Sequence, residues 1–190
     1  MNLTSRVFWF TGITGVGKTA VATALKHKIQ SYLKPEECNK IREFDSYLTS
    51  ANRYLSRSDR DGQVDLVLRQ SLLFSEIAHQ GGIVIASSIL SDHACIDTMD
   101  MIFKRVNIRP LLIELMCGKQ TLIARDHERN LYDIYSGKVT NVSGFDREYT
   151  SLRPAIKEGK NIDYLSITTD ELTINETVNV VLSHPSVVNA

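Results

Sequence analysis

A glycine-rich segment near the amino terminus has the residue types and spacing to hold the phosphates of a nucleotide. Residues 12–19 fit the pattern G-x-x-x-x-G-K-[ST], between an apolar run at 7–10 and a predicted helix. Glycines let backbone N–H groups approach phosphate oxygens that a Cβ atom would keep away. The Lys18 ammonium would reach the β- and γ-phosphates, and the Thr19 hydroxyl would ligate Mg²⁺. The predicted nucleotide-binding residues are Gly12, Thr14, Gly15, Val16, Gly17, Lys18 and Thr19.

An acid is needed opposite the phosphates if the chemistry is phosphoryl transfer. Asp45 ends a short predicted strand, and Glu43, two residues earlier, lies on the same strand face. Ligands of parallel sheets bind beyond the carboxyl ends of the strands. Asp45 could therefore accept the proton of an acceptor hydroxyl or hold Mg²⁺ through water. The alternative is that Asp45 only caps the turn that follows.

Cationic side chains that could close over the phosphates follow later in the chain. Residues 126–155 are polar and irregular, and we predict a lid at about 125–155 that carries Arg125, Arg129 and Lys138. Guanidinium groups match phosphate oxygens, so Arg125 would bind the nucleotide and neutralise charge in the transition state. The alternative is a solvated, charged surface segment.

The rest of the sequence predicts the elements that position these groups. Apolar strands alternate with helical patterns, which is typical of a parallel α/β sheet. We predict one domain over residues 1–190, with a three-layer P-loop kinase fold and a five-stranded parallel sheet flanked by helices. The strands are expected at 6–11, 40–44, 83–86, 111–116 and 164–167, and the helices at 18–33, 63–80, 93–104, 119–125 and 175–182.

Absent motifs narrow the class of nucleotide-binding protein. No N/T-K-x-D guanine-binding motif occurs, and Asp59-Arg60-Asp61-Gly62, which fits D-x-x-G, follows no strand, so we interpret it as a turn. The apolar strand at 83–86 ends in Ser87-Ser88 rather than in an acidic magnesium residue, which disfavours an ATPase motor. A small-molecule kinase fits best.

Composition bounds the partners. Lys and Arg together number 22, as do Asp and Glu, so net charge indicates neither nucleic acid nor an anionic membrane as a partner. Three separated cysteines, with no C-x-x-C, are typical of free thiols in a reducing compartment. With no secretory leader pattern and no apolar run long enough to span a bilayer, we expect a cytoplasmic protein.

Several segments resemble the adenylylsulfate (APS) kinase family. The phosphate-binding segment with its flanks is similar to the opening of that family, as is the segment 81–87. Further similarity covers Ala124-Arg125-Asp126 with 130–132, the stretch 143–149, and the tail 165–173. The resemblance spans nearly the whole chain. It implies an ATP- and Mg²⁺-dependent kinase that phosphorylates a hydroxyl, in the family the 3′-hydroxyl of APS, and a possible homodimer.

The departures from the family concern the acceptor. The family's D-G-D stands here as Glu43-Phe44-Asp45, and the two phenylalanines that sandwich the adenine of APS are replaced by Ser88 and Val142. A stacked ring contributes about 1–3 kcal/mol, so their loss argues against APS itself. The family's asparagine and arginine in the next helix align with Gln63 and Asp65, and an arginine is kept at position 60. The candidate acceptor-binding residues are Glu43, Phe44, Arg60, Ser88, Lys138 and Val142.

The sequence therefore predicts a kinase that transfers the γ-phosphoryl group of ATP to a hydroxyl of a small-molecule acceptor. Lys18, Asp45 and Arg125 are the candidate catalytic residues, with Thr19 and Asp45 at the metal. Two alternatives remain open at this point. One is APS kinase activity proper, and the other is a nucleotide-binding regulatory protein that transfers nothing.

Overall fold

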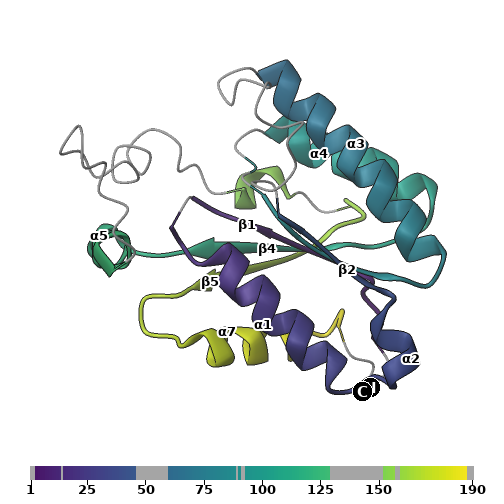
Figure 1. Ribbon diagram of the computed structural model, residues 1–190. Helices are drawn as coiled ribbons and strands as arrows, with labels where there is room; N and C mark the ends of the chain where they lie inside the picture. The colour runs from purple at the N-terminus through teal and green to yellow at the C-terminus, as the bar shows by residue number, and fades with distance from the viewer. Residues whose placement is uncertain are drawn as a thin grey trace.

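A parallel sheet forms the centre of the computed structural model, which describes residues 3–13, 15–45, 60–88, 90, 93–128, 152–156 and 159–187. All strand pairings are parallel, and the order across the five-stranded sheet is β2-β3-β1-β4-β5 (Figure 1). The predicted α/β class and parallel sheet are confirmed. The strands are β1 (Val7–Thr11), β2 (Ile41–Asp45), β3 (Ile83–Ser87), β4 (Leu111–Met116) and β5 (Asp163–Thr168).

The central strands are buried on both faces, as their unbroken apolar runs predict. In β1, Val7 and Trp9 join one core cluster, while Phe8 and Phe10 join the other, and all four side chains are fully buried. Successive side chains of a strand point to opposite faces, so one short strand contributes to both cores.

Helices cover both faces and complete three layers. Helices α1 and α7 lie on one face of the sheet, while α3 and α4 lie on the other (Figure 1). The described helices are α1 (Lys18–Gln30), α2 (Pro35–Cys38), α3 (Arg60–His79), α4 (His93–Arg105), α5 (Lys119–Glu128), the 3₁₀ turn η2 (Arg153–Ala155) and α7 (Ile174–Leu182). None of them is both long and apolar enough to cross a bilayer.

Some predicted boundaries were wrong. Helix α1 ends at Gln30 rather than at residue 33, and Pro35 begins α2 instead of only stopping a helix. Proline suits the first turn of a helix, where its missing N–H has no partner to lose. Arg60 opens α3, so residues 60–62 are helical and not the turn that we predicted.

Only parts of the predicted lid, at about 125–155, lie within the described residues. Helix α5 continues to Glu128, and after the undescribed residues 129–151 the chain packs again at Leu152 and Ala155, which are buried. The structure therefore does not test a lid, and the candidates Arg129, Lys138 and Val142 lie outside the described residues.

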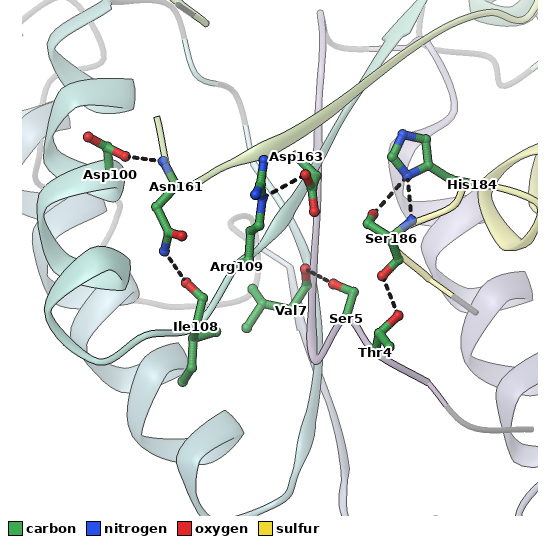
Figure 2. A network of polar contacts seen from close by, with 10 residues as sticks. All are labelled: Thr4, Ser5, Val7, Asp100, Ile108, Arg109, Asn161, Asp163, His184 and Ser186. Atoms are coloured by element: carbon green, nitrogen blue, oxygen red, sulfur yellow. Dashed lines mark hydrogen bonds and ion pairs between the residues drawn. The ribbon is translucent and has the colours of Figure 1, made fainter. Parts of the chain in front are cut away.

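Polar contacts join the segments that precede β4 and β5, at the amino ends of the strands (Figure 2). Arg109 pairs with Asp163 at 2.7 Å. Asn161 donates through its backbone N–H to Asp100 and through its side chain to the Ile108 carbonyl, each at 2.6 Å. These contacts join the approaches to β4 and β5 to α4. The phosphate-binding segment lies at the opposite end of the strands, after the carboxyl end of β1.

Candidate nucleotide-binding and phosphoryl-transfer site

The phosphate-binding segment depends on glycine at two positions. Gly12 has φ +132°, and a Cβ atom placed there would lie 2.3 Å from the Leu115 carbonyl oxygen of β4. Gly17 is the N-cap of α1 and has φ +105°, a conformation that L side chains rarely adopt. Gly15 also has positive φ, and Thr14 lies outside the described residues. The loop thus leads from β1 to the amino end of α1, where the helix dipole favours anions.

Lys18 begins α1 and turns back over this loop. Its side chain is only 8% exposed, and Nζ donates to the carbonyl oxygens of Gly12 and Ile13, each at 2.8 Å. Phosphate oxygens carry more negative charge than carbonyl oxygens and form stronger hydrogen bonds with an ammonium group. We therefore expect a bound nucleotide to replace the two carbonyl groups as the partners of Lys18.

The two predicted magnesium residues are brought together. The Thr19 hydroxyl donates to Oδ2 of Asp45 at 2.9 Å, so the first turn of α1 meets the end of β2. Within the described ranges, no three His, Cys, Asp or Glu side chains gather as a metal site. One hydroxyl and one carboxylate nevertheless fit Mg²⁺, which takes few protein ligands and completes its octahedron with water and substrate phosphates.

Glu43 holds α1 against β2. Oε1 accepts from the Thr23 hydroxyl at 2.6 Å, and Oε2 pairs with Lys26 at 3.0 Å. Burial alone would raise the pKa of the Glu43 carboxyl, but the hydrogen bonds from Thr23 and Lys26, with the Lys26 charge, lower it overall. Both oxygens are therefore engaged by α1, and acceptor binding by Glu43 stays a prediction without support from these contacts.

Arg125 lines a cavity beside the phosphate-binding segment. Nη1 donates to the Val16 carbonyl and to Oγ1 of Thr169, each at 3.0 Å, and Nη2 donates to the Thr169 carbonyl at 2.8 Å. The cavity has a volume of about 210 Å³. It is lined by Val16, Gly17, Ala20, Val21, Arg125, Thr169, Leu172, Ile174 and Thr177.

The far wall of this cavity was missed by reasoning from the sequence. Thr169 and Leu172 belong to the connection between β5 and α7, and Ile174 is the first residue of α7, all more than 140 positions after the phosphate-binding segment. One signal was available, because Thr169 follows the carboxyl end of a predicted strand, where ligands of parallel sheets bind.

Two candidate acceptor residues on the other side of β1, Ser88 and Phe44, make contacts in the hydrophobic core. Ser88 is 4% exposed, and its Oγ accepts a hydrogen bond from Nε1 of Trp9 at 2.6 Å. The Phe44 ring packs on Phe74 with centroids 4.9 Å apart, and Phe74 in turn meets Trp9 edge to face at 5.0 Å. Phe44 therefore extends an aromatic cluster beneath α3.

The remaining acceptor candidates are only partly described. Arg60 lies at the start of α3, but its side chain is outside the described set. Asp65 pairs with Arg69 one turn later at 2.8 Å, on the exposed side of α3. Acceptor binding by Arg60 therefore stays a prediction.

A buried acid in β4 was not singled out from the sequence. Glu114 is 2% exposed; it accepts from the Leu152 backbone N–H at 2.9 Å and from the Tyr164 hydroxyl. An acid inside an apolar strand needs such partners, because an unpaired buried charge is costly. Through Leu152, Glu114 binds the segment 152–156 to β4.

Comparison with known proteins agrees with this geometry. Residues 4–157 match the model of the adenylylsulphate kinase family. A cytidine diphosphoramidate kinase of Campylobacter jejuni is 28% identical over 149 residues, which cover 75% of this chain and 79% of the relative. A probable adenylyl-sulfate kinase of Pseudomonas aeruginosa is 26% identical over 184 residues, covering 95% and 77%.

A solved structure shows the same fold. The APS kinase CysC of Mycobacterium tuberculosis, in complex with AMPPNP and APS, superposes with a TM-score of 0.66 at 18% identity. The alignment covers 94% of this chain and 95% of that one. With a phosphate loop on this fold and a family match over most of its length, the chain belongs to the adenylylsulphate kinase family and is a kinase of that family.

Proposed function

We propose that this kinase transfers the γ-phosphoryl group of Mg²⁺-bound ATP to a hydroxyl of a small, nucleotide-like metabolite. The observation that carries the proposal is the 2.9 Å contact between Thr19 and Asp45, next to the buried ammonium of Lys18. Together these groups provide a phosphate clamp, a metal site and a carboxylate at the carboxyl edge of one sheet.

The groups divide the tasks of the reaction, and Asp45 has two of them. Lys18 and the loop N–H groups hold the phosphates, and Thr19 and Asp45 hold the metal. Mg²⁺, when bound, neutralises charge on the β- and γ-phosphate oxygens. Asp45 orients the acceptor hydroxyl and accepts its proton. A new bond forms between that oxygen and the γ-phosphorus, the bond to the β–γ bridging oxygen breaks, and ADP leaves.

The donor base occupies the cavity beside Arg125 in this proposal. The cavity adjoins Val16 and Gly17 of the phosphate-binding segment and has apolar walls at Leu172 and Ile174. A guanidinium plane stacks on aromatic rings, so Arg125 would cover one face of the base. Its present contacts to Val16 and Thr169 favour this role; neutralisation of transition-state charge by Arg125 stays a prediction.

The acceptor is proposed to be a nucleotide derivative other than APS. The relatives from Campylobacter jejuni and Pseudomonas aeruginosa are named for cytidine diphosphoramidate and for adenylyl sulfate, and both names denote substituted nucleotides. Against APS stands Ser88, which has no ring and whose hydroxyl is buried under Trp9. Cytidine diphosphoramidate is therefore the first acceptor to test.

A transfer assay tests the proposal. The purified chain, Mg²⁺ and γ-labelled ATP are incubated with cytidine diphosphoramidate, with APS and with a panel of nucleotides and sugars. We expect labelled product from a nucleotide acceptor, and Lys18→Ala should abolish it. ATP binding without transfer to any acceptor would instead establish the regulatory alternative, and turnover of APS at about 1–100 per second would identify an APS kinase.

A further inference from the structure

Helix α5 carries Arg125 into the nucleotide cavity but has few apolar anchors of its own. Among residues 119–125, whose side chains are described, only Leu122 is buried. Figure 1 shows α5 at the margin of the molecule, beyond the end of β4. Polar contacts must therefore contribute much of what holds the helix in place.

Asp170 makes those contacts at the amino end of α5. Its oxygens accept from the Gly118 backbone N–H at 2.8 and 3.1 Å, and Oδ1 also accepts from the Thr121 hydroxyl. The first N–H groups of a helix lack intrahelical partners, and here a residue 52 positions away supplies the cap. Hydrogen bonds from Thr121 and from the Gly118 backbone lower the pKa of the Asp170 carboxyl, with a smaller contribution from the Arg125 charge.

The preceding residue binds the same helix further along. Thr169 accepts two hydrogen bonds from Arg125, and its own N–H donates to the Met116 carbonyl of β4 at 2.8 Å. Two consecutive residues thus hold α5 at its first turn and at Arg125. Such a pair of contacts restricts both the tilt of the helix and its rotation about its own axis.

We infer that Asp170 is a positioning residue for the donor nucleotide: by capping α5 it sets where the Arg125 guanidinium stands in the cavity. Asp170 is not among the residues that line the cavity, so it acts through Arg125. A functional side chain holds its geometry only when neighbouring groups support it. The inference rests on the proposed role of this cavity in ATP binding.

The test compares nucleotide affinity in matched variants of the full chain. Calorimetry with AMPPNP and Mg²⁺ is run on the wild type, on Asp170→Ala and on Glu171→Ala, the exposed neighbour. We expect Asp170→Ala to raise Kd by about tenfold, the size expected from the loss of one helix cap. Glu171→Ala should change Kd by less than about twofold.

A double-mutant cycle separates positioning from general stability. If Asp170 acts through Arg125, the pair Asp170→Ala and Arg125→Ala should bind AMPPNP no more weakly than Arg125→Ala alone. Additive losses, or an unchanged Kd in Asp170→Ala, would overturn the inference. Should Asp170→Ala not fold, Asp170→Asn keeps an acceptor for the Gly118 N–H while losing the charge, and Thr121→Val tests the other bond.

The two proposals fail differently. A wild-type chain that binds no AMPPNP would contradict the proposed donor site, and with it this inference. A wild-type chain that binds AMPPNP tightly, with Asp170→Ala equally tight, would contradict this inference alone.

Discussion

Polar side chains have different surroundings on the two sides of β1. On the donor side, Lys18 and Thr19 begin α1, whereas Arg125 comes from α5, and they lie around one loop and one cavity. On the side of α3, Ser88 and Phe44 turn into the core, where they support Trp9 and Phe74. In the proposed function the first side is the donor half, which surrounds a cavity, and the other is the acceptor half, whose described residues Ser88 and Phe44 pack in the core.

The difference follows from what each half must recognise. Phosphates are bound largely by backbone N–H groups and a few fixed side chains. The donor half therefore needs glycine at particular loop positions and tolerates few substitutions there. An acceptor is recognised by side chains, which can change without disturbing the backbone. Acceptor specificity in this fold can therefore change through side chains while the phosphate loop stays as it is.

The largest effect is expected at the carboxylate of the donor half. Asp45→Asn removes the proton acceptor and should lower kcat by about 10²–10⁴-fold. Without Mg²⁺, the Kd of AMPPNP should change little, because the phosphate loop is untouched. Steady-state kinetics and calorimetry measure the two quantities. Asp65→Asn, on the exposed side of α3, is the control; equal losses in both variants would deny Asp45 a special role.

The next largest effect is expected on the free energy of unfolding when a side chain is added to the phosphate-binding segment. Gly12→Ala places Cβ 2.3 Å from the Leu115 carbonyl oxygen, and overpacking of this kind costs about 1–3 kcal/mol. Gly17→Ala also has positive φ but meets no heavy atom within 4 Å, so it should be destabilised less. Urea unfolding compares the two, and a milder effect in Gly12→Ala would refute the steric account.

A smaller effect distinguishes packing from acceptor binding at Ser88. Ser88→Ala leaves the buried Trp9 N–H without its acceptor and should lower the free energy of unfolding by about 1–2 kcal/mol. The KM values for ATP and for the acceptor should stay the same. An acceptor KM raised at unchanged stability would show that Ser88 contacts substrate after all.

The smallest expected effect concerns pH. Because the folded state lowers the pKa of Glu43, its ionised form stabilises the fold above the ordinary value of 4.5, and this stabilisation is lost as pH falls below that value. Glu43→Gln should reduce unfolding free energy by under about 1 kcal/mol near neutrality, since the pair with Lys26 is partly exposed. The difference should shrink in acid. Glu36→Gln, at an exposed position of α2, is the control for removing one carboxylate charge.

Local patterns predicted much of the fold and part of the site. Runs such as 83–86 and 111–116 marked central strands, and the helix expected at 175–182 is α7, which begins with a capping box in which the Thr173 hydroxyl accepts from the Glu176 N–H at 3.2 Å. Thr19 and Asp45 were both expected at the metal, and they meet because the end of β2 lies beside the first turn of α1. Boundaries were less predictable, because proline at 35 can end one helix or begin another.

What could not be predicted depends on contacts between distant segments. Nothing near Asp170 in the sequence indicates that it caps a helix 52 positions earlier. Likewise, Ser88 follows the end of β3, and nothing near it in the sequence indicates that its partner is Trp9 of β1. Such pairs are specified by the register of the folded sheet, where Trp9 lies beside Ala86, and not by periodicity along the chain.

Trp9 also makes the protein its own optical probe. It is the single tryptophan of the chain, fully buried and hydrogen-bonded through its indole N–H. All tryptophan emission therefore comes from one rigid, apolar environment, three residues before the phosphate loop begins. Its wavelength and intensity follow the β1–β3 junction without a dye or a label. Binding that disturbs this junction can be followed by fluorescence in the unmodified protein.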